Sequence, residues 1–126
     1  MHGVLGSLGS AANQFYNPYG LHGDSNTGML YIADHTNDRI TSYQFTTGSS
    51  SIVAGGNGPG LTTTQLWYPH AIFFDAISNS LLIANANGNN IVRWTLSANE
   101  WTLVVGHMDG SSGNTSTTLN YPSDVM

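Results

Sequence analysis

The sequence has no cysteine and almost no positive charge. Lys and Arg together number 2 against 7 Asp and Glu, which gives the 126 residues a formal net charge of −5. Without cysteine, disulfides, thiolate metal sites and thiol catalysis are excluded. Two cations cannot neutralise the roughly 6–10 phosphates of a typical nucleic-acid contact, nor bind an anionic membrane surface. We therefore expect neither nucleic acid nor a membrane as a partner.

Long apolar runs are absent as well. No stretch approaches the roughly 18 consecutive apolar residues of a membrane span, and residues 1–12 lack the basic and apolar regions of a signal peptide. Charged residues make up 7% of the chain and hydrophobic residues 40%. Disorder pairs low hydrophobicity with high charge, so this composition predicts a folded protein, within the size of a single domain. The cellular location stays open.

The chain repeats itself. Pro18, Pro69 and Pro122 begin equivalent segments spaced by 51 and 53 residues, and 24–34 aligns with 75–85 without a gap. Such a period is the signature of repeat architectures. We divide the chain, 1–126, into the end of a preceding unit at 1–13, a first repeat at 14–64, a second at 65–118 and the start of a third at 119–126.

Each full copy contains four short β-type runs separated by residues that tolerate positive φ. No segment shows a helical start followed by a 3.6-residue period. Four antiparallel strands in about 50 residues, repeated, predict an all-β protein made of β-propeller blades, two per chain. The runs are Tyr19–Gly23, Met29–Ala33, Ile40–Phe45 and Ser51–Ala54, and then His70–Phe74, Leu81–Ala84, Ile91–Leu96 and Trp101–Val105.

These repeats resemble the NHL-repeat family of β-propellers. Phe15–Leu21 reads aromatic-x-x-Pro-x-Gly-Leu, Leu30–Ile40 reads Leu-Tyr-Ile-Ala-Asp-x-x-Asn-x-Arg-Ile, and Val53–Gly56 reads Val-Ala-Gly-Gly. The resemblance covers nearly the whole chain and implies blades that usually close six to a ring. The second copy departs from the pattern at three positions, Asn85, Gly88 and Asn90. A fold of this kind indicates function only weakly.

Two blades alone leave two apolar sheet faces bare, and such faces drive association. We expect three chains to complete a six-bladed ring as a homotrimer, with four chains or a piece of a longer array as alternatives. Val4–Gly6 and Leu119–Met126 duplicate strands supplied elsewhere, so one of them is expected to complete a neighbour's blade by strand exchange. The stop inside a strand motif is typical of a truncated or engineered fragment.

Polar residues at the second turn of each copy are candidate binding residues, and so are the aromatic residues that precede Pro69, which alternatively pack between blades. One interpretation is a polar face around the central channel that binds a peptide or small molecule. The other is that Asp34 caps its turn and Arg39 packs or pairs against a neighbouring blade. Asp24 and Asp75 are expected to close the turn after the first strand. The candidates are Asp34, His35, Asn37, Arg39, Asn85, Asn87, Trp67 and Tyr68.

Metal and catalytic chemistry has few candidates. His22 and His70 lie in first-strand runs, which line the channel of a propeller, and a homotrimer would repeat each of them around its axis. They do not align with each other between the copies. No serine lies in a Gly-x-Ser-x-Gly elbow, and the glycine-rich segment 55–60 lacks a following Lys-Ser/Thr. We assign no catalytic residue, resident metal or cofactor.

The preferred function is a non-enzymatic, self-assembling scaffold that binds itself and a protein or peptide ligand. Its ligand surface is expected on the length-variable connections Ser7–Gln14, Gly56–Gln65 and His107–Leu119, because loops on a rigid scaffold usually carry binding. The alternative is a propeller-type metal-dependent lyase or hydrolase that uses His and Asp at the central channel.

Overall fold

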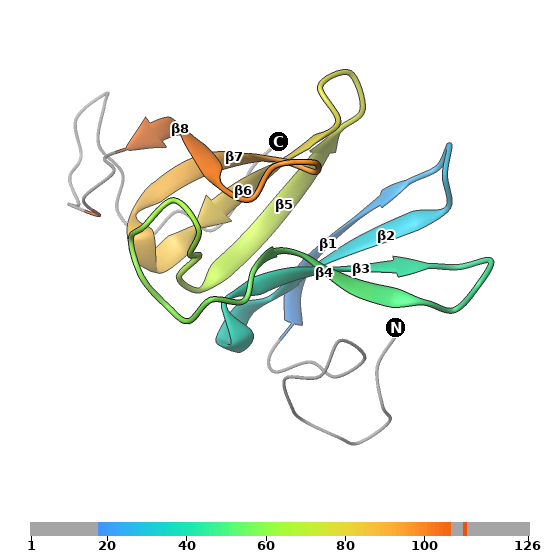
Figure 1. Cartoon of the computed structure of the whole chain (residues 1–126), viewed down its shortest axis with the longest axis horizontal. Coiled ribbons are helices and arrows are strands. Elements are labelled where there is room, and N and C mark those ends of the chain that lie inside the picture. The colour runs from blue at the N-terminus through green and yellow to red at the C-terminus, as the bar shows by residue number, and fades with distance from the viewer. Residues whose placement is uncertain (1–17, 107–109, 111–126) are drawn as a thin grey trace.

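The computed structural model describes residues 18–106 and residue 110, and it contains two four-stranded antiparallel sheets (Figure 1). Each sheet is a meander in which neighbouring strands follow one another in the chain. Blade 1 consists of β1 (Pro18–Asp24), β2 (Met29–Asp34), β3 (Arg39–Gln44) and β4 (Ser50–Gly55). Blade 2 consists of β5 (Pro69–Asp75), β6 (Ser80–Asn85), β7 (Asn90–Thr95) and β8 (Trp101–Gly106).

The second sheet repeats the first with a constant offset. Every strand of blade 2 begins and ends 51 residues after its counterpart in blade 1. The prediction of four antiparallel strands in each copy is therefore confirmed, with small differences at strand ends. The third strand ends at Gln44, so Phe45 lies in the following turn and is exposed.

A single 3₁₀ turn joins the second and third strands of each blade, η1 (His35–Asn37) in blade 1 and η2 (Ala86–Gly88) in blade 2. Asp38 (φ 55°) and Asn89 (φ 53°) end these turns in the left-handed region. Asn and Asp tolerate this conformation better than other non-glycine residues. The sequence predicted the turns from these residue types, but it did not predict their 3₁₀ geometry.

The core lies in the contact between the two blades, which we call the seam. Alternate residues of β2 and β3 point from blade 1 toward blade 2, among them Tyr31, Ala33 and Ile40. They meet Leu81 and Ile83 of β6 within one buried apolar cluster. The core is therefore shared, since neither sheet encloses one by itself.

The innermost strands of the two blades, β1 and β5, pass close to each other. A Cβ on Gly20 would lie 2.8 Å from the carbonyl oxygen of His70 and 2.9 Å from Cα of Ala71. Only glycine permits this approach of the two backbones. The glycine of the repeat motif thus sets the distance between the blades at their inner edge.

The connection Gly56–Gln65 belongs to the segment between β4 and β5 (Figure 1), and it is hydrogen-bonded to the last strand of blade 2. The backbone N–H of Trp101 donates to the carbonyl of Thr63 at 2.8 Å, and the indole Nε1–H donates to the carbonyl of Gln65 at 2.8 Å. Within the loop, Asn57 Nδ2 donates to the carbonyl of Thr64 at 2.8 Å. This connection is an ordered loop with its own hydrogen bonds.

Several expectations concern residues outside the described part of the chain. They are the terminal segments 1–13 and 119–126 with Val4–Gly6 and Leu119–Met126, the connection Ser7–Gln14, and the connection His107–Leu119 apart from residue 110. Among the described residues, no helix is long and apolar enough to cross a membrane.

Candidate functional site

The β2–β3 turn of blade 1 is held by a buried ion pair. Asp34 ends β2 and Arg39 begins β3, so the antiparallel register places them opposite each other. Arg39 Nε donates to Asp34 Oδ2 at 2.8 Å, and their side chains are only 3% and 0% exposed. Asn37 Nδ2 donates to the same oxygen at 2.9 Å. Arg39 therefore pairs with Asp34 of its own turn, whereas the sequence suggested a partner on a neighbouring blade.

The equivalent turn of blade 2 uses neutral amides instead. Asn85 Nδ2 donates to Asn90 Oδ1 at 3.1 Å, and both residues are fully buried. Asn85 Oδ1 accepts the backbone N–H of Trp67 at 2.6 Å, and the backbone N–H of Asn87 donates to the carbonyl of Trp67 at 3.1 Å. These hydrogen bonds hold the turn of blade 2 against Trp67, in the segment that leads into β5.

Blade 1 also holds this entry to β5. Asp38 Oδ1 accepts the backbone N–H of Tyr68 at 2.9 Å. Burial raises the pKa of Asp38, while the bond from Tyr68 lowers it and the negative charge of Asp34 raises it further. The same position in blade 2, Asn89, donates from Nδ2 to the carbonyl of Gly110 at 2.9 Å. In both blades the left-handed residue of the turn bonds to the connection that follows.

Four aromatic rings meet at this end of the seam, and we call Tyr19, His35, Tyr68 and His70 the ring cluster. His35 stacks on Tyr68 with centroids 4.5 Å apart and planes 16° apart, and it lies edge-on to Tyr19 at 4.5 Å. Tyr19 stacks in turn on His70 at 4.5 Å, and His70 meets His35 edge-on at 5.7 Å. Two of the predicted binding residues, His35 and Tyr68, are thus brought into contact.

His35 is the unusual member of the ring cluster. It is 8% exposed, and neither of its ring nitrogens has a hydrogen-bond partner in the part of the chain that the structure describes. Burial lowers its pKa, and the charge that His70 can carry lowers it further. Burial therefore favours the neutral imidazole over the charged form.

The two histidines considered as metal ligands lie in different contacts. Nδ1 of His22 accepts the backbone N–H of Phe74 at 2.8 Å, and its ring stacks on Phe73. His70 belongs to the ring cluster. Within 18–106 and residue 110, no group of three or more His, Cys, Asp or Glu side chains could hold a metal ion.

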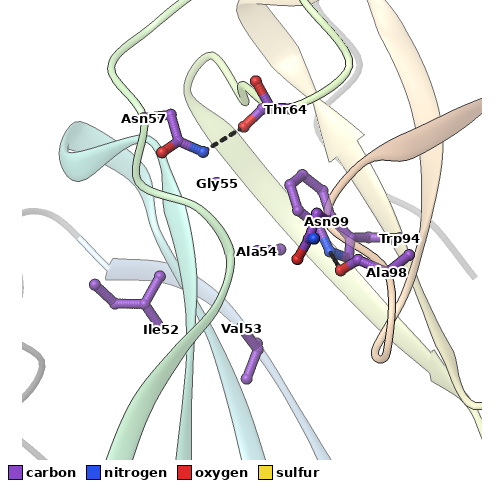
Figure 2. A pocket seen from close by; sticks show the side chains of 9 residues that line it. All are labelled: Ile52, Val53, Ala54, Gly55, Asn57, Thr64, Trp94, Ala98 and Asn99. Atoms are coloured by element: carbon purple, nitrogen blue, oxygen red, sulfur yellow. Dashed lines mark hydrogen bonds between the residues drawn. The ribbon is translucent and has the colours of Figure 1, made fainter.

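A groove opens between the blades at their outer rim, beside the edge strand β4 (Figure 2). Its volume is about 460 Å³, which is within the range of small-ligand pockets. None of its lining residues carries a charge, and amide, hydroxyl and apolar groups are mixed along it. The inter-blade groove is lined by Ile52, Val53, Ala54, Gly55, Asn57, Thr64, Trp94, Ala98 and Asn99.

The inter-blade groove and the ring cluster differ in how far the sequence pointed to them. Asn57 and Thr64 belong to the variable connection Gly56–Gln65, which was expected to carry ligands. Trp94 and Asn99 were missed because only the packing of blade 2 against β4 brings them there. Tyr19 of the ring cluster was also missed, since a tyrosine in an inner strand has no distinctive motif.

Comparison with known proteins bears on the fold alone. No family model matches the chain, and no curated protein matches it. Among solved structures, 46 chains are similar. One belongs to the crystal structure of a nidogen/laminin complex, with a TM-score of 0.64 and 22% sequence identity over 87% of this chain. This chain spans 35% of that chain's length. The likeness and the two four-stranded sheets show a β-propeller-like fold with two blades.

Proposed function

We propose that this chain is a two-blade unit of an NHL-type β-propeller that acts as a non-enzymatic, self-assembling scaffold for protein interactions. The units are a first blade at 14–64 and a second at 65–118, flanked by 1–13 and 119–126. The alternative of a metal-dependent lyase or hydrolase has no supporting group of ligands among the described residues.

One observation carries the proposal: residues that are buried in the seam have exposed equivalents on the outer faces. Ile72 of blade 2 packs against blade 1 and is 6% exposed, whereas its equivalent in blade 1, Leu21, is 61% exposed. Ala54 of blade 1 lies in the seam and is 2% exposed, whereas Val105 of blade 2 is 36% exposed. We call the outer face of blade 1 the Leu21 face and the outer face of blade 2 the Val105 face. They are equivalent to the two surfaces that meet in the seam, so they could form the same type of contact.

A second copy of the chain fits these faces best. Its Leu21 face would cover the Val105 face of the first copy, as blade 2 covers blade 1 inside one chain. This contact is heterologous, so it closes only if the rotation per copy divides a full turn. Three copies with six blades are the closure that NHL-type propellers imply. Bare apolar strands of this kind otherwise favour aggregation.

The partner surface of the assembled scaffold would lie at the outer rim. The inter-blade groove is bounded by the connection Gly56–Gln65 and contains no ionisable side chain. It therefore suits an uncharged segment of a partner protein. The turn residues Asp34, Arg39 and Asn85 are buried and bonded within the chain, so they would support such a surface without touching the partner.

Light scattering on the purified chain tests the proposal. Three copies of 13.4 kDa are expected, and Leu21→Asp should reduce the mass to that of one chain by placing a charge in the contact. Ile77→Asp is the matched control, because Ile77 is 99% exposed in the β5–β6 turn and away from both faces. A folded wild-type monomer, or an equal loss of mass in both variants, would contradict self-assembly.

A further inference from the structure

The ring cluster joins the two blades at the inner end of the seam. Tyr19 belongs to β1 and His35 to η1, both in blade 1. Tyr68 and His70 belong to the entry and first strand of blade 2. The stacked pairs Tyr19–His70 and His35–Tyr68 each cross from one blade to the other. A change in the charge of this cluster would therefore fall at the contact between the blades.

His35 is buried in a setting that suits only its neutral form. An imidazolium has two N–H donors, but neither ring nitrogen of His35 has an acceptor within the described residues. A buried charge without such partners is costly. The ring face of Tyr68 attracts a cation, yet it replaces neither the lost water nor the missing acceptors.

We propose that the ring cluster makes the seam sensitive to pH, so that the two blades hold together while His35 is neutral and separate more easily once His35 takes up a proton. The proposal deepens the function proposed above, since it names a regulation of the two-blade unit. It concerns a contact within one chain and therefore does not depend on how many copies assemble.

The other ionisable groups around His35 do not supply the missing partner. From β1 and β5 it faces Tyr19 and His70, and from the connection it faces Tyr68. On its own turn, the carboxylate of Asp34 is engaged by Arg39 and Asn37. The carboxylate of Asp38 accepts the backbone N–H of Tyr68. A proton on His35 would also repel a charge on His70.

The direction of the effect follows from proton linkage. The pKa of His35 lies below its ordinary value of 6.5 in the folded chain, so the unfolded chain binds more protons in the interval between the two values. Stability is fully present above 6.5 and is lost as the pH falls through that interval. Blade 2 has the buried Ala86 at the position equivalent to His35, so its own turn has no titrating side chain at this position.

The test compares the full chain with His35→Phe and His35→Ala by thermal unfolding at about pH 7.5 and about pH 5.5. His35→Phe keeps a stacked ring, and His35→Ala copies blade 2. Between about pH 7.5 and about pH 5.5, the melting temperature of each variant should fall by about half as much as that of the wild type, or less. His35→Ala should also melt lower than His35→Phe at both, because it removes the ring contacts.

A second measurement keeps the proposal falsifiable if a variant folds poorly. Histidine ring NMR on the wild-type chain should show His35 titrating below 6.5. The proposal is overturned if His35 titrates at or above that value, or if both variants retain the full acid-induced fall. A wild-type monomer that shows the His35-dependent fall would refute self-assembly and leave the pH-sensitive seam standing.

Discussion

The chain has only two cationic side chains, both arginines, and the two blades use them differently. Arg39 in blade 1 pairs with Asp34 inside the β2–β3 turn, where their side chains are 3% and 0% exposed. Arg93 in blade 2 pairs with Asp75 near the surface, at 3.2 Å, where their side chains are 33% and 29% exposed. An Arg–Asp ion pair is thus buried in blade 1 and partly exposed to solvent in blade 2.

This difference shows what the repeated turn requires. At the positions of Asp34 and Arg39, blade 2 has Asn85 and Asn90, which bridge the same two strands by an amide–amide hydrogen bond. The turn geometry and its left-handed last residue are the same in both blades. What the fold needs is a bonded pair of side chains across the turn, and charge is one of two ways to supply it.

The largest effect is expected when the buried ion pair of blade 1 is broken on one side. Arg39→Ala leaves the carboxylate of Asp34 buried without its cation, which should cost about 3–5 kcal/mol of the free energy of unfolding. Asn90→Ala in blade 2 removes the acceptor of the buried, neutral Asn85 amide. This change should lower the free energy of unfolding by about 1–3 kcal/mol. Denaturant unfolding of both variants at neutral pH measures the difference.

Asp34→Asn provides the control for the role of charge. Because it removes the carboxylate, combining it with Arg39→Ala should recover part of the stability that Arg39→Ala alone loses. Equal losses for Arg39→Ala and Asn90→Ala would mean that charge does not distinguish the two turns.

An intermediate effect is expected when the three motif departures of blade 2 are introduced into the turn of blade 1. The triple variant Asp34→Asn, Asn37→Gly, Arg39→Asn copies Asn85, Gly88 and Asn90. The glycine is included because a Cβ on Gly88 would lie 2.5 Å from Asn85 Nδ2. Replacing a whole buried ion pair is often near neutral, so the variant should lie within about 2 kcal/mol of the wild type. If it unfolds as readily as Arg39→Ala, the two turns are not interchangeable.

The sequence predicted the blades well because their information is local and repeated. Strand runs, turn residues and the 51-residue offset can be read from one copy and checked against the other. The departures at Asn85, Gly88 and Asn90 were visible in the alignment. Their consequence, a neutral bridge in place of an ion pair, follows from the register that aligns Asn85 with Asn90.

The sites between the blades were harder to predict, because they depend on how one sheet packs on the other. His35 and Tyr68 were both candidates, but nothing in the sequence shows that their rings stack or that His35 lacks hydrogen-bond partners. Trp94 reaches the inter-blade groove only through the same packing. Such contacts join residues that are distant in sequence and follow no periodic pattern.

The smallest effect is expected at the exposed ion pair of blade 2. Asp75 accepts hydrogen bonds from Ser78 Oγ at 2.8 Å and from Arg93 Nη1 at 3.2 Å. These bonds hold the pKa of Asp75 below its ordinary value of 3.8, with the Ser78 bond contributing most. Arg93→Gln should therefore raise the pKa of Asp75 only part of the way toward 3.8, and Ser78→Ala should raise it further.

Carboxyl NMR titration of Asp75 in the two variants measures this order. Since the pKa is lowered in the folded chain, the associated stability is present above 3.8 and is lost as the pH falls through the folded value. Near neutral pH, Arg93→Gln should destabilise the chain far less than Arg39→Ala, because exposed ion pairs are weakened by water and salt. A larger pKa change in Arg93→Gln than in Ser78→Ala would show that charge matters at the surface of blade 2 more than hydrogen bonding does.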